Sequence, residues 1–138
     1  MLTELLARMM LVEWAAKDLH YGSNGESFYS LHLLADKVSL SGLTDDLKEA
    51  AFLGNNAVPP PMEEISKKAI ELKRPVDNTG NVSLVSTLHD SCSDVIYLIE
   101  EVKRLATISA GVHAILDSIS QHLLVVKGLC WRTMNANI

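Results

Sequence analysis

Apolar residues recur every three or four positions along most of this chain, and this spacing limits what the chain can fold into. The clearest examples lie near the two ends. They are Leu5, Met9, Val12, Ala16 and Leu19, then Ile115, Ile119, Leu123, Val126 and Cys130. Such spacing places side chains on one face of an α-helix. Aromatic residues make up only 5% of the chain, which favours helices packed through aliphatic side chains over a β-sandwich. The sequence therefore predicts an all-α fold.

The first two long helices are predicted within residues 1–56. The first runs from about residue 3 to 21, and a turn rich in Gly, Ser and Asn follows it. The second begins near Ser27 and continues to about residue 53, where Gly54-Asn55-Asn56 ends it. Ser41-Gly42 weakens this second helix, and Thr44-Asp45-Asp46 is predicted to cap its continuation.

Three consecutive prolines, Pro59 to Pro61, forbid a helix and predict a stiff, extended connection. Three further helices and two links are predicted after them. They are a short amphipathic helix at 62–73, a loop at 75–81, a long helix at 82–107, a tight link at 109–111 and a last helix at 112–134. Short links after the first and third long helices, and a long crossover between the second and third, suit an up-down-down-up bundle.

Length, charge and cysteine content restrict the class of protein. The 138 residues form one domain, 1–138, large enough for a core without disulfides or metals. The net charge is −5 with no cluster of Lys or Arg, so binding of nucleic acid is disfavoured. Cys92 and Cys130 lack CxxC spacing and are predicted to be buried and reduced. No apolar run reaches the roughly 20 residues of a membrane span, and we expect a soluble, cytoplasmic protein.

Residues 20–36, HYGSNGESFYSLHLLAD, contain the most specific pattern in the chain. His32 follows His20 by twelve positions, and Asp36 follows His32 by four. The Gly-rich middle lets the chain turn, so His20 can end one helix while His32 and Asp36 share a face of the next. Two imidazoles and a carboxylate are ligands for iron or zinc. The pattern predicts a metal site at His20, His32 and Asp36.

This segment resembles the ferroxidase half-site of the Dps family (DNA-protection-during-starvation proteins), the small dodecameric branch of the ferritin-like proteins. Seven positions carry the resemblance. They are His20, Tyr21, Gly25, Phe28, Leu31, His32 and Asp36. It implies a ferritin-like four-helix bundle whose long crossover carries a short helix between the second and third long helices. It also implies an iron site shared by two subunits. Many Dps proteins bind DNA through a lysine-rich tail, which the opening MLTELLARMM does not provide.

The resemblance implies a second half-site, an Asp and a Glu four residues apart, donated by the partner subunit. The family's Asp falls at Leu47, which cannot bind a metal. Asp45 and Glu49 have the required spacing but come two residues early, which turns them by roughly 200° around an unbroken helix. A break near Gly42 or a shifted register could compensate. Asp46 with Glu49 is a second choice, and an ordinary acidic helix start explains these residues equally well.

Two functions follow as expectations. The first is a possible ferroxidase that binds iron at His20, His32, Asp36, Asp45 and Glu49. It would form a homodimer through the half-site face, and further assembly, up to a dodecameric shell, would store the iron. Zinc could substitute for iron at the site. The alternative is a ferritin-like bundle without a complete oxidase site, acting as a metal-binding or interaction module.

The remaining histidines are expected to serve the structure. His113 with Asp117, and His89 with Asp90 and Asp94, are expected to form surface hydrogen bonds. His122 stands alone and is expected to be a packed or capping residue. No Glu-x-x-His motif, P-loop or hydrolase triad is present.

Overall fold

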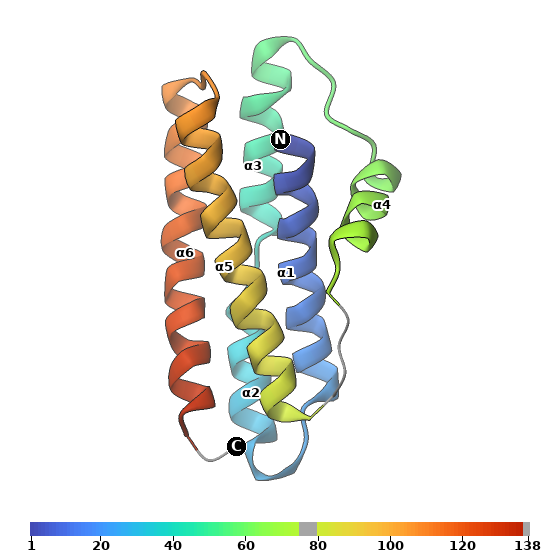
Figure 1. Cartoon of the computed structure of the whole chain (residues 1–138), viewed down its shortest axis with the longest axis vertical. Helices are drawn as coiled ribbons and strands as arrows, with labels where there is room; N and C mark the ends of the chain where they lie inside the picture. Colours follow the sequence, from blue (N-terminus) through green and yellow to red (C-terminus); the bar gives the residue numbers. More distant parts are fainter. Residues whose placement is uncertain (75–79, 137–138) are drawn as a thin grey trace.

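The computed structural model describes residues 1–74 and 80–136, and over these ranges all regular structure is helical (Figure 1). The six α-helices and two short 3-10 turns follow one another in a simple order. They are α1 (Leu2–Gly22), η1 (Gly25–Ser27), α2 (Phe28–Asp36), α3 (Ser41–Ala51), η2 (Leu53–Asn55), α4 (Met62–Leu72), α5 (Asn81–Leu105) and α6 (Ala110–Met134). The predicted all-α fold is confirmed. The predicted loop at 75–81 lies outside the described residues at 75–79.

The bundle has four columns, because α2 and α3 follow one another along the same edge (Figure 1). The chain descends through α1, rises through α2 and α3, rises again through α5 and descends through α6 (Figure 1). α1 packs against α2 and α5, and α6 packs against α5 and α3. Each of these neighbours is therefore antiparallel to the helix it touches. The apolar faces meet in the middle, where Leu5, Leu19, Leu88 and Leu116 are fully buried.

The second predicted helix is broken four residues earlier than expected. Residues 37–40 separate α2 from α3, and Ser41 and Gly42 form the first turn of α3 rather than a weak point. Val38 and Leu40 are both buried, at 1% and 0% exposure. In an unbroken helix two residues at this spacing point about 200° apart, so the chain must leave the helix to bury both. The Thr44 N–H donates to the Leu40 carbonyl at 2.8 Å, and Thr44 lies inside α3 instead of capping it.

The other boundaries fall close to their predicted places. Asn56 adopts a left-handed backbone, with φ of 55°, just after η2. Pro61 is extended and directly precedes α4. The link predicted at 109–111 lies earlier, at residues 106–109, because α5 ends at Leu105 and α6 begins at Ala110. The Ser109 hydroxyl accepts the Val112 N–H at 3.2 Å and caps α6.

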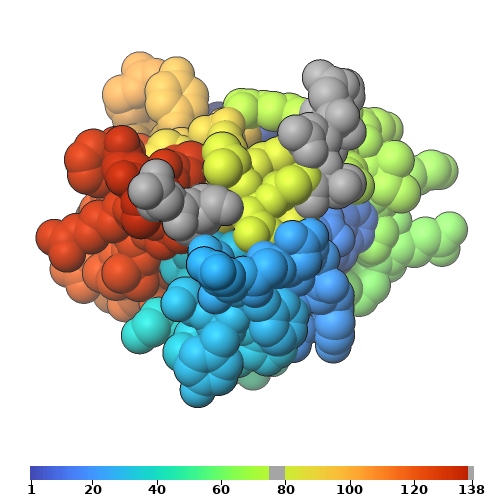
Figure 2. Space-filling model, turned by 90° about the horizontal axis from the view of Figure 1, so that it is seen from below, coloured from blue at the N-terminus to red at the C-terminus, as the bar shows by residue number. Residues whose placement is uncertain are grey.

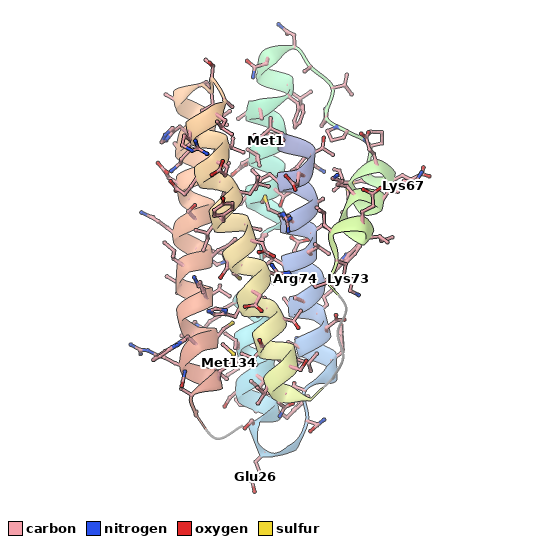
Figure 3. The ribbon with its side chains drawn as sticks, viewed as in Figure 1. Met1, Glu26, Lys67, Lys73, Arg74 and Met134 are labelled. Carbon is pink, nitrogen blue, oxygen red and sulfur yellow. The ribbon has the colours of Figure 1, made fainter. Side chains whose placement is uncertain are left out.

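The segment between α3 and α5 crosses the outside of the bundle. α4 packs on α1 within it, and Lys67 projects away from the other helices (Figure 3). Arg74, which follows α4, donates to Asp94 at 2.8 Å and lies 4.0 Å from Asp90. Asp94 also lies 3.6 Å from Arg8 of α1. The Arg74 pairs fasten the chain just after α4 to α5, and the Arg8 pair joins α1 to α5.

Both cysteines are free and lie in the core, as predicted. Burial raises the pKa of the Cys92 thiol to about 12, and burial also raises the pKa of the Cys130 thiol to about 12. Both thiols therefore stay protonated at neutral pH and pack as small apolar side chains. Among the described helices, none is long and apolar enough to cross a membrane.

Removal of a core side chain should destabilise the bundle far more than removal of an exposed one on the same helix. We expect Leu116→Ala, at a fully buried position of α6, to lower the free energy of unfolding by about 2–5 kcal/mol. The exposed Leu124 of α6 provides the control, and Leu124→Ala should change it by no more than about 0.5 kcal/mol. Urea unfolding followed by circular dichroism measures both. Equal losses would contradict the assigned inner face of α6.

Candidate metal centre

The α1–α2 turn brings two distant parts of the sequence together. Gly25 has φ of 76°, a left-handed conformation that suits glycine and reverses the chain. Asn24 and Asn81 exchange two hydrogen bonds, from the Asn24 N–H to the Asn81 side chain at 3.1 Å and from that side chain to the Asn24 carbonyl at 2.8 Å. The turn is thus fastened to the start of α5, and the two lie side by side at this end of the bundle (Figure 2). Glu26 points from it into solvent (Figure 3).

This turn places His20, His32 and Asp36 side by side. The Nδ1 atom of His20 lies 3.0 Å from Asp36 Oδ1, and the Nε2 atom of His32 lies 4.0 Å from Asp36 Oδ2. His20 comes from the last turn of α1, whereas Asp36 is the last residue of α2. The Asp36 carboxylate is about half exposed. The three side chains predicted from the sequence therefore form one donor cluster.

The two imidazole rings of the donor cluster are stacked. Their centroids lie 3.7 Å apart with 34° between the ring planes. Tyr21 meets His20 edge-on at 4.6 Å, and Phe28 lies 5.5 Å from the His32 ring. The aromatic contacts therefore hold both rings beside the Asp36 carboxylate.

The size of the donor cluster fits a divalent ion. Its three ligand atoms all lie within 4.8 Å of one another. Bonds of 2.0–2.2 Å to one tetrahedral ion place donors about 3.3–3.6 Å apart, so separations near the 4.8 Å limit must shorten by about 1–1.5 Å. Rotation of the half-exposed Asp36 carboxylate can supply much of this. The cluster gives three ligands of the four to six that such an ion takes.

One atom of the donor cluster lacks a partner within the described part of the chain. The Nδ1 atom of His32 is buried and has no hydrogen bond there. A metal-binding imidazole usually donates its second N–H to a carbonyl or carboxylate.

A hollow of about 450 Å³ opens beside the donor cluster. Its walls include His20 and Asp36 at one end, the 37–40 break along one side, and Glu13 of α1. Burial raises the pKa of the Glu13 carboxyl, and nearby Asp45 raises it further, while Lys17 opposes the change.

The predicted second half-site is not assembled within one chain. Asp45 and Glu49 are exposed on α3 and do not belong to the donor cluster. Leu47 is fully buried, so the position that holds the family's Asp faces the core here. Whether a second copy of the chain brings Asp45 and Glu49 to the donor cluster stays a prediction.

His113 and His89 each form the expected local contact with an aspartate, but Asp94 pairs with Arg8 and Arg74 instead of His89. The Nδ1 atom of His113 lies 3.3 Å from Asp117, and that of His89 lies 3.1 Å from Asp90. His122 contacts the Val38 carbonyl at 3.2 Å. Sequence reasoning missed the ion pair between Lys103 and Asp117. That pair joins α5 to α6, and the spacing of residues within one helix cannot predict a contact between two helices.

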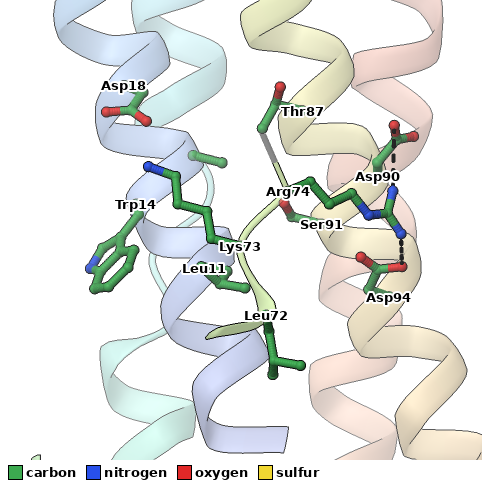
Figure 4. A pocket seen from close by; sticks show the side chains of 11 residues that line it. Leu11, Trp14, Asp18, Leu72, Lys73, Arg74, Thr87, Asp90, Ser91 and Asp94 are labelled. Atoms are coloured by element: carbon green, nitrogen blue, oxygen red, sulfur yellow. Dashed lines mark hydrogen bonds and ion pairs between the residues drawn. The ribbon is translucent and has the colours of Figure 1, made fainter. Parts of the chain in front are cut away.

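A separate cavity of about 140 Å³ lies between α1, α5 and the end of α4 (Figure 4). Trp14 and Leu72 line it together with Arg74, whose guanidinium is already paired with Asp90 and Asp94 (Figure 4). None of the three donor-cluster residues lines this cavity. It therefore adds nothing to the candidate metal centre.

Comparison with models of known protein families gives no match, and comparison with curated proteins also finds no relative.

Placing an aspartate at residue 47 should not create a metal site. We expect Leu47→Asp to lower the free energy of unfolding by about 3–5 kcal/mol, because it leaves an unpaired charge in the core, without increasing affinity for divalent ions. Leu47→Met preserves volume and should cost less than about 1.5 kcal/mol. Thermal unfolding and Co(II) titration measure the two effects. Tighter Co(II) binding by Leu47→Asp would show that residue 47 faces the metal.

Neutralising Glu13 should stabilise the protein at neutral pH. Its raised pKa means that the folded state holds the proton more tightly than the unfolded state does. Glu13 therefore disfavours folding increasingly as the pH rises from the unfolded value of about 4.5 through the raised folded value. Glu13→Gln should raise Tm by a few degrees at pH 7 and hardly at all at pH 4. A matched Glu49→Gln variant should show neither effect, and a lower Tm for Glu13→Gln at pH 7 would refute this account.

Proposed function

We propose that this chain is an iron-binding and iron-oxidising storage protein similar to the Dps family, with Fe(II) as its substrate at the donor cluster. The observation that supports this most directly is that His20, His32 and Asp36 lie close together in the fold. These residues are spread over seventeen positions of the sequence, yet their ligand atoms lie within 4.8 Å of one another. A ligand set predicted from spacing alone is brought together by the fold.

The chemistry of the donor cluster suits iron. Two neutral imidazoles and one carboxylate bind Fe(II), and zinc binds to the same set of donors. An anionic oxygen ligand such as Asp36 favours Fe(III) over Fe(II), so the site assists loss of an electron to peroxide or dioxygen. The hollow beside His20 and Asp36 gives Fe(II) and a small oxidant access from solvent.

The path of the chain supports a ferritin-like interpretation of the all-α bundle. α2–α3 and α5 run in the same direction, and the long connection between them carries the short helix α4 (Figure 1). One long crossover of this kind joins the two halves of ferritin-like bundles. The structure differs from a regular bundle of this type in the break at 37–40.

A second copy of the chain is the partner that this proposal requires. Exposed apolar side chains lie on the ends of α1 and α2 that carry the donor cluster, and a monomer would leave them in water. They are Tyr21, Phe28, Tyr29 and Leu33. A homodimer through this face would cover them and add the missing ligands, for which Asp45 and Glu49 are the nearest predicted source. Further assembly, up to twelve subunits, would enclose a store for ferric iron, and the net charge of −5 suits a cation-attracting cavity.

One observation favours the alternative function, a ferritin-like bundle that binds a metal or a partner without oxidising iron. Leu47 is fully buried where the family's Asp would lie. With only three ligands the donor cluster would bind an ion weakly and would lack the carboxylates that hold a second iron. In this alternative the chain still dimerises, and metal binding stays confined to one half-site.

Removal of His32 should abolish iron chemistry and leave the fold intact. We expect His32→Ala to weaken Fe(II) binding more than about 100-fold, because a direct ligand matters more than the outer-shell partners whose loss costs 10–100-fold. Peroxide-driven oxidation should fall to the rate of free Fe(II). The measurement is anaerobic Fe(II) titration followed by peroxide, with ferric absorbance recorded for wild type, His32→Ala and His20→Ala/His32→Ala.

His113→Ala is the matched control, because His113 also pairs with an aspartate four residues later on an exposed helix face. It should oxidise iron like wild type. Fast oxidation in wild type and His113→Ala alone would support the ferroxidase. Tight binding without fast oxidation would support the alternative. Equal, slow oxidation and equal, weak binding in all four proteins would refute both.

A further inference from the structure

We propose that His122 is a positioning residue for the metal centre, which it serves by fixing the end of α2 that carries Asp36. The inference rests on the proposed function of the donor cluster. His122 belongs to α6, eighty-four residues away from its contact in the sequence, and its Nε2 atom lies 3.2 Å from the Val38 carbonyl. Among the described hydrogen bonds, this is the one that joins a side chain of another helix to the backbone of the 37–40 break.

The break leaves backbone groups that need partners. The Lys37 N–H bonds back to the Leu34 carbonyl and the Val38 N–H to the Ala35 carbonyl, both at 3.2 Å, and the Leu40 carbonyl accepts from the Thr44 N–H. Among the described residues, no backbone N–H bonds to the Val38 carbonyl. A carbonyl only accepts, so the His122 Nε2 must carry the hydrogen and donate it. A buried helix end without such a partner would be costly.

His122 itself is held firmly in place. Ile119 and Leu123, on either side of it along α6, are fully buried, and α6 packs against both α2 and α3. Val38 is also held by its own side chain, which is 1% exposed in the core. Val38 is therefore fixed through its N–H, its side chain and its carbonyl, two residues after Asp36.

This fixation matters because Asp36 has little support of its own. Its carboxylate is about half exposed, and its described contacts are with His20 and His32 alone. Asp36 also lies at the negative end of the α2 dipole, where an unpaired carboxylate is disfavoured. Without the His122 bond the end of α2 would loosen, and Asp36 would have to be ordered each time an ion binds. Metal affinity would fall although no ligand has been removed.

The test compares side chains that can and cannot donate to Val38. His122→Gln places an amide N–H near the original Nε2 position, whereas His122→Leu fills the space without a donor and His122→Asn carries the same amide too far back to reach. Co(II) is the probe, because its visible absorption reports coordination geometry. Kd and the spectrum at saturating Co(II) are measured well below Tm, alongside His32→Ala. Val112→Ala, a buried site at the far end of α6, is the control for destabilisation alone.

We expect His122→Leu and His122→Asn to raise the Co(II) Kd about tenfold, the lower end of the effect of outer-shell partners, and to alter the saturated spectrum. His122→Gln should restore both, and Val112→Ala should lower Tm with Kd and spectrum unchanged. If His122→Leu does not fold, the Asn and Gln pair decides. Wild-type binding by His122→Asn, with loss in His32→Ala, would overturn this inference alone. No Co(II) binding by wild type would overturn it together with the proposed function.

Discussion

Burial of Val38 and Leu40 determines the arrangement of the whole α2–α3 edge. The two side chains are two residues apart, and both enter the core, which a continuous helix cannot achieve. The chain therefore stops one helix at Asp36 and starts another at Ser41. This break ends α2 directly after a candidate ligand, opens the hollow beside His20 and gives α6 a backbone carbonyl to bind. The site and its proposed support both depend on it.

Most of the fold could be predicted from the sequence, because helical periodicity is a local property. The apolar spacing of α1, α5 and α6 fixed their lengths to within a few residues. The break could not be placed in the same way. Low helix propensity predicts that Ser41-Gly42 interrupts the helix, but the burial of Val38 and Leu40 places the interruption at 37–40. Propensities of this size, about 1 kcal/mol for Gly, are smaller than the gain from burying two aliphatic side chains.

Only the part of the candidate site that lies on two helices joined by a short link could be predicted from the sequence. His20, His32 and Asp36 belong to two helices joined by a short link, and their spacing sufficed to bring them together. Glu13 and His122 were not connected with the site from the sequence, since Glu13 meets it across a hollow and His122 acts from another helix. The place of Asp45 and Glu49 depends on a second copy of the chain, which no spacing within one chain determines.

Burial of the two cysteines affects how readily an oxidant can react with them. Only a thiolate reacts readily with peroxide, and the Cys92 and Cys130 thiols hold their protons to about pH 12. Under the proposed function, a core that offered peroxide an easy electron donor would be damaged by the protein's own reaction. The protonated thiols between α5 and α6 offer none, so under that proposal oxidation should fall first on the exposed Tyr21 ring against His20.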